Sequence, residues 1–134
     1  MIYNVTWLTS KTKQIYSASK NSEVLMSYLE ERLINSNVVE LIGEHPVPDK
    51  GREYGVIIYY YTTKPKRRLL SAAPRRDHDH IHVVLFRGIL SRSQLLENKF
   101  EVGNSADPQP DIKVHTKTEI DILVELIQKN LQQI

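Results

Sequence analysis

The 134-residue sequence contains no cysteine, which excludes disulfide scaffolds and thiolate metal sites. Any bound metal would therefore need histidine or carboxylate ligands. No apolar run approaches the roughly 18–20 residues that span a membrane. The first residues, MIYNVTWLTSKTK, lack the basic start and long apolar core of a secretory signal. We therefore expect a soluble, intracellular protein with no membrane partner.

The length suits a single domain, 1–134, and a hydrophobic content of 40% is sufficient for a core. The net charge of +2 does not by itself indicate a nucleic-acid partner. The distribution of charge is more informative, because the stretch from residue 64 to residue 76 contains basic residues and no acidic one. These basic residues are Lys64, Lys66, Arg67, Arg68, Arg75 and Arg76.

This basic stretch has two interpretations. Charged runs are typical of solvated loops, and this one contains two prolines, Pro65 and Pro74. Clustered lysine and arginine side chains also release counterions from a nucleic-acid backbone. The stretch is therefore either an ordinary surface connector or an arm that contacts phosphates.

Hydrophobic periodicity and turn-forming residues predict five strands and three helices. The expected strands are 2–9, 38–44, 54–63, 80–88 and 111–116. The expected helices are 21–35, 91–100 and 118–134, and polar connectors are expected at 11–20, 45–53, 64–77 and 103–110. This order predicts an α+β fold, in which helices pack on a central antiparallel sheet of about five strands.

The expected closing helix, 118–134, has an apolar stripe at helical spacing. Its members are Ile120, Leu123, Val124, Ile127, Leu131 and Ile134. Such a stripe usually packs in the core of its own chain. The alternative is a dimerisation surface, which would make the protein a homo-oligomer through its C-terminal helix.

The stretch DHDHIHVVLFRG, 77–88, places His78, His80 and His82 at alternate positions. Alternate residues of a strand point to the same face. Two imidazoles on one face can bind a divalent metal when a third ligand comes from elsewhere. Glu40 and Glu44 are candidate third ligands, and Glu40 lies among apolar residues where an unpaired carboxylate is costly. The simpler alternative is a polar strand edge with ordinary histidines.

The segment HIHVVLF resembles the His-hydrophobic-His motif of the HUH endonuclease superfamily, the replication initiators of small DNA viruses and plasmids. YNVTWLTSK is similar in placement to the first motif of that family, a strand that ends in a DNA-contacting turn. PDIKVHTKTEIDILVELIQKN resembles its late strand and helix. The resemblance implies an HUH/Rep-like fold, a DNA partner and Mg²⁺ or Mn²⁺ at His80 and His82, often with a third polar ligand. Glu40 remains a candidate for that ligand from its position in the sequence alone.

One feature of the family is missing, namely the tyrosine on the late helix that attacks the scissile phosphate. No tyrosine follows Tyr61, and the family position falls on Leu126 when Lys129 is taken as the family lysine. Relatives of the relaxase type carry the nucleophile upstream, where Tyr16 is the candidate. We therefore expect DNA binding with impaired or absent tyrosine-mediated nicking.

The origin-binding domains of polyomavirus and papillomavirus initiators share this general architecture and bind duplex DNA without cutting it. TWLTSKTK is similar to the DNA-contacting strand and turn of the polyomavirus domain. The resemblance implies backbone contacts from Thr9, Ser10, Lys11 and Lys13. The DNA partner is thus either single-stranded or an origin duplex.

HDHIHVV also resembles the His-φ-His-φ-His-φ-φ motif of the histidine-triad nucleotide hydrolases, where φ is hydrophobic. Asp79 occupies a position at which that motif has a hydrophobic residue. This second resemblance implies an enzyme in which His80 attacks an α-phosphate. The sequence therefore indicates three alternative functions: a DNA-binding domain, a nucleotide hydrolase and a non-enzymatic interaction domain.

Overall fold

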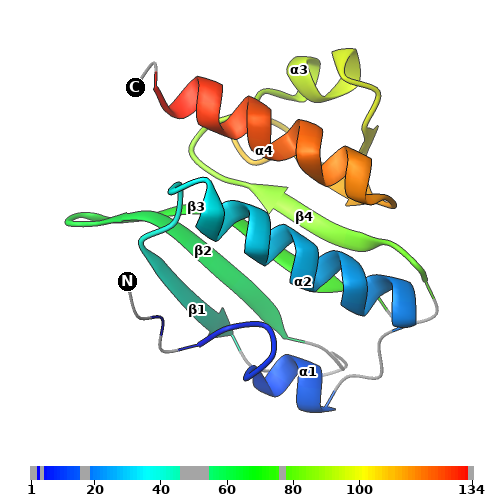
Figure 1. The fold of residues 1–134 in the computed structure, drawn as a ribbon. Helices are drawn as coiled ribbons and strands as arrows, with labels where there is room; N and C mark the ends of the chain where they lie inside the picture. The colour runs from blue at the N-terminus through cyan, green and yellow to red at the C-terminus, as the bar shows by residue number, and fades with distance from the viewer. Residues whose placement is uncertain (1–2, 4, 16–18, 46–54, 76–77, 133–134) are drawn as a thin grey trace.

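The computed structural model describes residues 3, 5–15, 19–45, 55–75 and 78–132. Within these ranges, six strands form one antiparallel sheet in the order β1-β2-β3-β4-β6-β5 (Figure 1). The strands are β1 Leu41–His45, β2 Val56–Thr63, β3 Lys66–Pro74, β4 Ile81–Leu85, β5 Glu101–Val102 and β6 Asp111–Val114. The predicted α+β class and antiparallel sheet are confirmed, with six strands in the sheet.

Four helices accompany the sheet in the described part of the chain. They are α1 Lys11–Ile15, α2 Lys20–Asn35, α3 Arg92–Glu97 and α4 Lys117–Leu131. Figure 1 shows α2 and α4 side by side over one face of the sheet. The helices expected at 21–35 and 118–134 are thus present as α2 and α4, and the one expected at 91–100 is the shorter α3.

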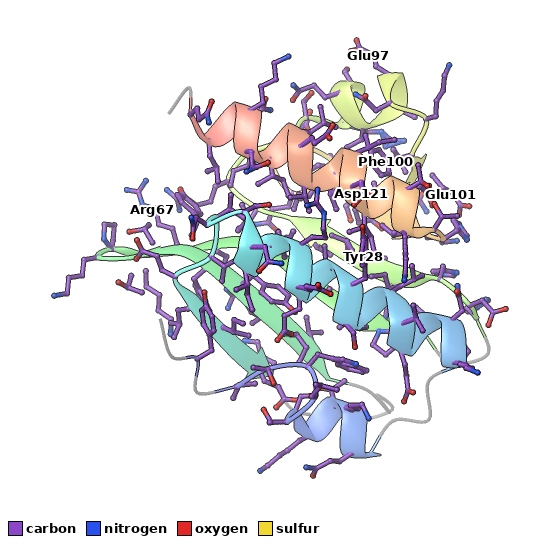
Figure 2. All side chains as sticks on the ribbon, in the orientation of Figure 1. Tyr28, Arg67, Glu97, Phe100, Glu101 and Asp121 are labelled. Carbon is purple, nitrogen blue, oxygen red and sulfur yellow. The ribbon has the colours of Figure 1, made fainter. Side chains whose placement is uncertain are left out.

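Helix α4 packs its apolar stripe inside the chain, as the core interpretation predicted. Ile120, Leu123, Val124 and Ile127 are fully buried. The two long helices are also joined by polar contacts, because Asp121 Oδ1 accepts hydrogen bonds from Tyr28 Oη at 2.6 Å and from Arg32 Nε at 2.9 Å (Figure 2). An oligomer that used α4 would have to use a different side of that helix.

Strand alternation sets the two faces of the sheet. Ile81, Val83 and Leu85 of β4 are fully buried and point toward the helices. The register places Ala73, His82 and Lys113 side by side on the opposite face, which we name the open face. None of the described helices packs on it. Its members on the central strands are Ile58, Tyr60, Arg68, Ser71, Ala73, His82, Val84, Asp111 and Lys113. Although no described helix covers them, Ile58, Tyr60, Ser71, Ala73 and Asp111 are buried.

The first expected strand, 2–9, is wrong for the residues of that range that the structure describes. Trp7 is buried, but its backbone N–H donates to the Glu30 carboxylate at 2.8 Å rather than to a neighbouring strand. A turn follows, in which Ser10 N donates to Trp7 O. The aromatic side chain of Trp7 is therefore buried in the core although the backbone around it is irregular. The connector expected at 11–20 likewise contains the short helix α1.

The basic connector expected at 64–77 is also wrong, because most of it is strand β3. Its basic flanks conceal the central run Leu69–Ala73, in which every residue is buried. Strand β2 pairs antiparallel with β3, and a tight hairpin at Lys64 and Pro65 joins the two strands. Only the pairing with β2 and β4 reveals this strand, because the basic residues at its start resemble a charged loop.

Candidate functional site

His82 lies on the open face between two charged side chains. Its Nδ1 is 2.7 Å from Arg75 Nη2, and its Nε2 is 2.8 Å from Asp111 Oδ2. A guanidinium can only donate, so Nδ1 must accept and Nε2–H must donate to the carboxylate. This arrangement requires a neutral imidazole. Burial lowers the pKa of His82, and the hydrogen bond to Asp111 opposes that effect only in part.

Asp111 orients this ring, and the only sequence feature that marks it is its position at the start of an expected strand. Its Oδ1 accepts from Ser105 N at 3.0 Å. Burial would raise the pKa of Asp111, but hydrogen bonds from His82 and Ser105 lower it. A Cβ atom at Gly103 would collide with the carboxylate, so glycine is required beside it.

Replacing this carboxylate by an amide tests the Arg75–His82–Asp111 chain. Asp111→Asn retains one acceptor for two donors, so one hydrogen bond is lost and the fold is destabilised by about 1–3 kcal/mol. Loss of the charge should also lower the pKa of His82 further. Thermal unfolding and the ¹⁵N shifts of the His82 ring measure both effects.

Glu101→Gln is the matched control, because Glu101 binds His115 and Lys113 but not His82. It should leave the His82 tautomer unchanged. A protonated Nδ1 in the unsubstituted protein at neutral pH would contradict the assigned hydrogen-bond direction.

His80 belongs to a second cluster. Its ring centroid is 4.9 Å from that of His78 and 5.3 Å from that of His115. Burial lowers the pKa of His80, and the nearby His115 and His78 lower it further. The three imidazole rings that lie close together are therefore those of His78, His80 and His115. His82, the third member of the alternating histidines in the sequence, is not among them. His80, the nucleophile of the hydrolase alternative, is only 8% exposed, and that alternative stays a prediction.

The predicted third metal ligand lies elsewhere. Glu40 Oε2 accepts from Thr63 N at 3.2 Å, beside β1. Strands β2 and β3 separate β1 from β4, which contains His82 and directly follows His80. The residues that the structure describes contain no group of three or more side chains arranged to hold a metal. Both His82 nitrogens are also engaged, one by a cation. Mg²⁺ or Mn²⁺ at His80 and His82 therefore stays a prediction, for which the described residues supply no third ligand.

The predicted DNA-contacting turn, Thr9 to Lys13, lies on the helical side of the sheet. Ser10 is buried, and its Oγ donates to Trp7 O at 2.7 Å. The N–H groups of Lys11 and Thr12 donate to Glu44, which points to the same face as Ile42 and away from the histidines. The structure therefore does not bring Thr9, Ser10, Lys11 and Lys13 together with the His pair.

The basic residues of β3 have a different placement. Arg68 lies on the open face with its guanidinium carbon 5.5 Å from the centre of the Phe86 ring. Lys66 Nζ lies 4.8 Å from the centre of the Tyr60 ring. Figure 2 shows Arg67 near the β2–β3 hairpin, and Lys64 is exposed in its turn. Arg76 lies outside the described residues.

Charge is distributed unevenly between the two layers. The two long helices carry six acidic residues and four basic ones, namely Glu23, Glu30, Glu31, Glu119, Asp121 and Glu125 against Lys20, Arg32, Lys117 and Lys129. On the open face, Asp111 is held by His82 and Ser105, while Lys66 and Arg68 rest on aromatic rings. The two long helices therefore have an excess of two acidic residues, whereas Lys66 and Arg68 on the open face have no carboxylate partner among the described residues.

Helix α4 lies across the sheet from His80 and His82. Leu126, at the family position of the tyrosine, is partly buried against the core on the helical side. No described side chain of α4 can therefore act as a nucleophile beside the His pair. Tyr16 lies outside the described residues.

Comparisons of the chain with protein-family models, with curated proteins and with solved structures gave no match. Within the described ranges, no helix has the length and apolarity needed to cross a membrane. A functional assignment therefore depends on the geometry of the open face.

Proposed function

We propose that this chain is a DNA-binding domain with an HUH/Rep-like architecture, which binds single-stranded DNA along the open face and does not nick it through a tyrosine. The observation that carries the proposal is the pairing of cations with aromatic rings, Lys66 with Tyr60 and Arg68 with Phe86, on a sheet face that no described helix covers. Single strands are bound by cations that follow the phosphates and by rings that stack on bases.

The length of the open face supports this proposal. From His80 to Phe86 the chain advances six residues, which is about 20 Å in a strand. Arg68 lies near Phe86 at one end of that path, and Arg75 contacts His82 at the other. Phosphates and bases can be contacted at the Arg68–Phe86 end, whereas Ser71, Ala73 and Asp111 along the path are buried.

Binding of a labelled single-stranded oligonucleotide, measured by fluorescence anisotropy, tests the proposed function. We expect affinity to fall steeply between about 50 and 200 mM salt, because phosphate contacts release counterions. The same sample with Mn²⁺ should show no covalent protein–DNA adduct on a denaturing gel. Absence of binding at the lowest salt would refute the proposal, and an adduct lost in Tyr16→Phe would refute its non-nicking part.

A further inference from the structure

A basic hollow of about 290 Å³ lies at one end of the open face. Its walls come from strand β3, from the chain just after β4 and from the loop before β6. The lining residues are Lys66, Arg67, Arg68, Phe86, Arg87 and Gln109. Phe86, Arg87 and Gln109 could not be predicted from the basic run in the sequence, because they lie far from it in the chain.

The four cations of the basic hollow have no carboxylate partner among the described residues. Two of them rest on rings instead, Lys66 on Tyr60 and Arg68 on Phe86. Like charges so close together repel one another, and a bound anion would relieve that repulsion. Arg87 adopts a positive φ of 60°, which is uncommon for a residue other than glycine.

We propose that the basic hollow binds a nucleotide phosphate monoester, with the attached base stacked on the Phe86–Arg68 pair. The proposal rests on the proposed function, for which it supplies the site of a terminal phosphate of the bound strand. A monoester carries about −1.5 to −2 charges at neutral pH, against one for an internal phosphate. Several cations in one hollow can compensate the higher charge of a single monoester. Internal phosphates are spaced along the strand and would need cations spaced in the same way.

The chemistry of the lining residues fits both parts of the ligand. Arg87 can bind a phosphate through two parallel N–H donors, and Lys66 adds a further positive charge. The Phe86 ring and the Arg68 guanidinium provide planar surfaces of the kind on which bases stack. Gln109 supplies an amide, with a donor and an acceptor, at the rim of the basic hollow.

The test compares oligonucleotides of one sequence that carry a 5′-phosphate, a 3′-phosphate or hydroxyls at both ends. We expect one phosphorylated form to bind about 10-fold more tightly than the hydroxyl form. The ratio between the two should fall to about one in Arg87→Gln. It should keep its full value in Lys129→Gln, which removes an exposed cation from α4. Circular dichroism checks that each variant is folded.

Titration with a free nucleoside monophosphate distinguishes a strand end from a free nucleotide as the source of the phosphate. If strands bind but neither a phosphorylated end nor the free nucleotide is preferred, the inference is overturned while the proposed function stands. If no strand binds, the proposed function fails, and nucleotide binding that is lost in Arg87→Gln would still support the basic hollow as a phosphate site. Absence of both kinds of binding overturns both.

Discussion

Lys66→Glu combined with Arg68→Glu is expected to weaken binding of single-stranded DNA by about 100-fold at moderate salt, because two phosphate contacts become repulsions. Both side chains lie over aromatic rings near the basic hollow. The slope of log affinity against log salt should also fall by about 1.4, since each phosphate contact on a single strand contributes about 0.7. Anisotropy titrations at several salt concentrations measure both quantities.

Lys117→Glu combined with Lys129→Glu is the matched control, because it changes the net charge by the same amount on α4. Both lysines are exposed and belong to the helical layer. We expect a loss of affinity well below 10-fold and a nearly unchanged salt slope. Equal losses in the two double variants would show that net charge alone governs binding, and the open face would then have no special role.

Glu30→Ala is expected to destabilise the fold by about 2–4 kcal/mol, which is large for one substitution. Glu30 is 7% exposed, and its Oε2 accepts from Trp7 N and from Tyr59 Oη, both at 2.8 Å. Alanine leaves two buried donors without this partner, and each unsatisfied group costs about 1–3 kcal/mol. Urea unfolding measures the loss, and Glu31→Ala, exposed on the same helix, should change stability by less than about 0.5 kcal/mol.

Glu30→Gln separates the hydrogen bonds from the charge. Both donors bind the same oxygen, so one amide oxygen can accept both, and the cost should be well below that of alanine. Burial raises the pKa of Glu30 above its ordinary value of 4.5. The folded state therefore retains the proton more readily than the unfolded chain, and this contribution to stability is lost as pH rises through the raised pKa.

It follows that the unsubstituted protein should gain stability relative to Glu30→Gln as pH falls from neutral toward about 4.5. Urea unfolding of both proteins over that pH range gives the difference in the free energy of unfolding. A difference that does not change with pH would show that Glu30 has the same pKa in the folded and unfolded states.

Elements with a regular apolar period could be predicted from the sequence. Helices α2 and α4 follow helical spacing and form within a few residues of their expected bounds. Strand β2 lies within 54–63, as expected. Local pattern was sufficient in these cases because each element buries one continuous stripe or run of its own residues.

Elements whose local structure depends on contacts with other elements could not be predicted from the sequence. Strand β3 has basic flanks, and its short buried run is recognisable only beside β2 and β4. Trp7 is of a residue type that is common in strands, yet its backbone N–H donates to the Glu30 carboxylate on α2. In both segments a long-range contact decides the local structure, and propensity cannot supply that contact.

The histidine row shows the same division at the candidate site. Alternation is a property of any strand, so the sequence alone predicts that His80 and His82 point away from Ile81 and Val83. The partners of these histidines depend on the three-dimensional fold. His82 meets Arg75 and Asp111 because β3 and β6 flank β4, and strand order depends on the packing of the whole chain rather than on the pattern of one strand.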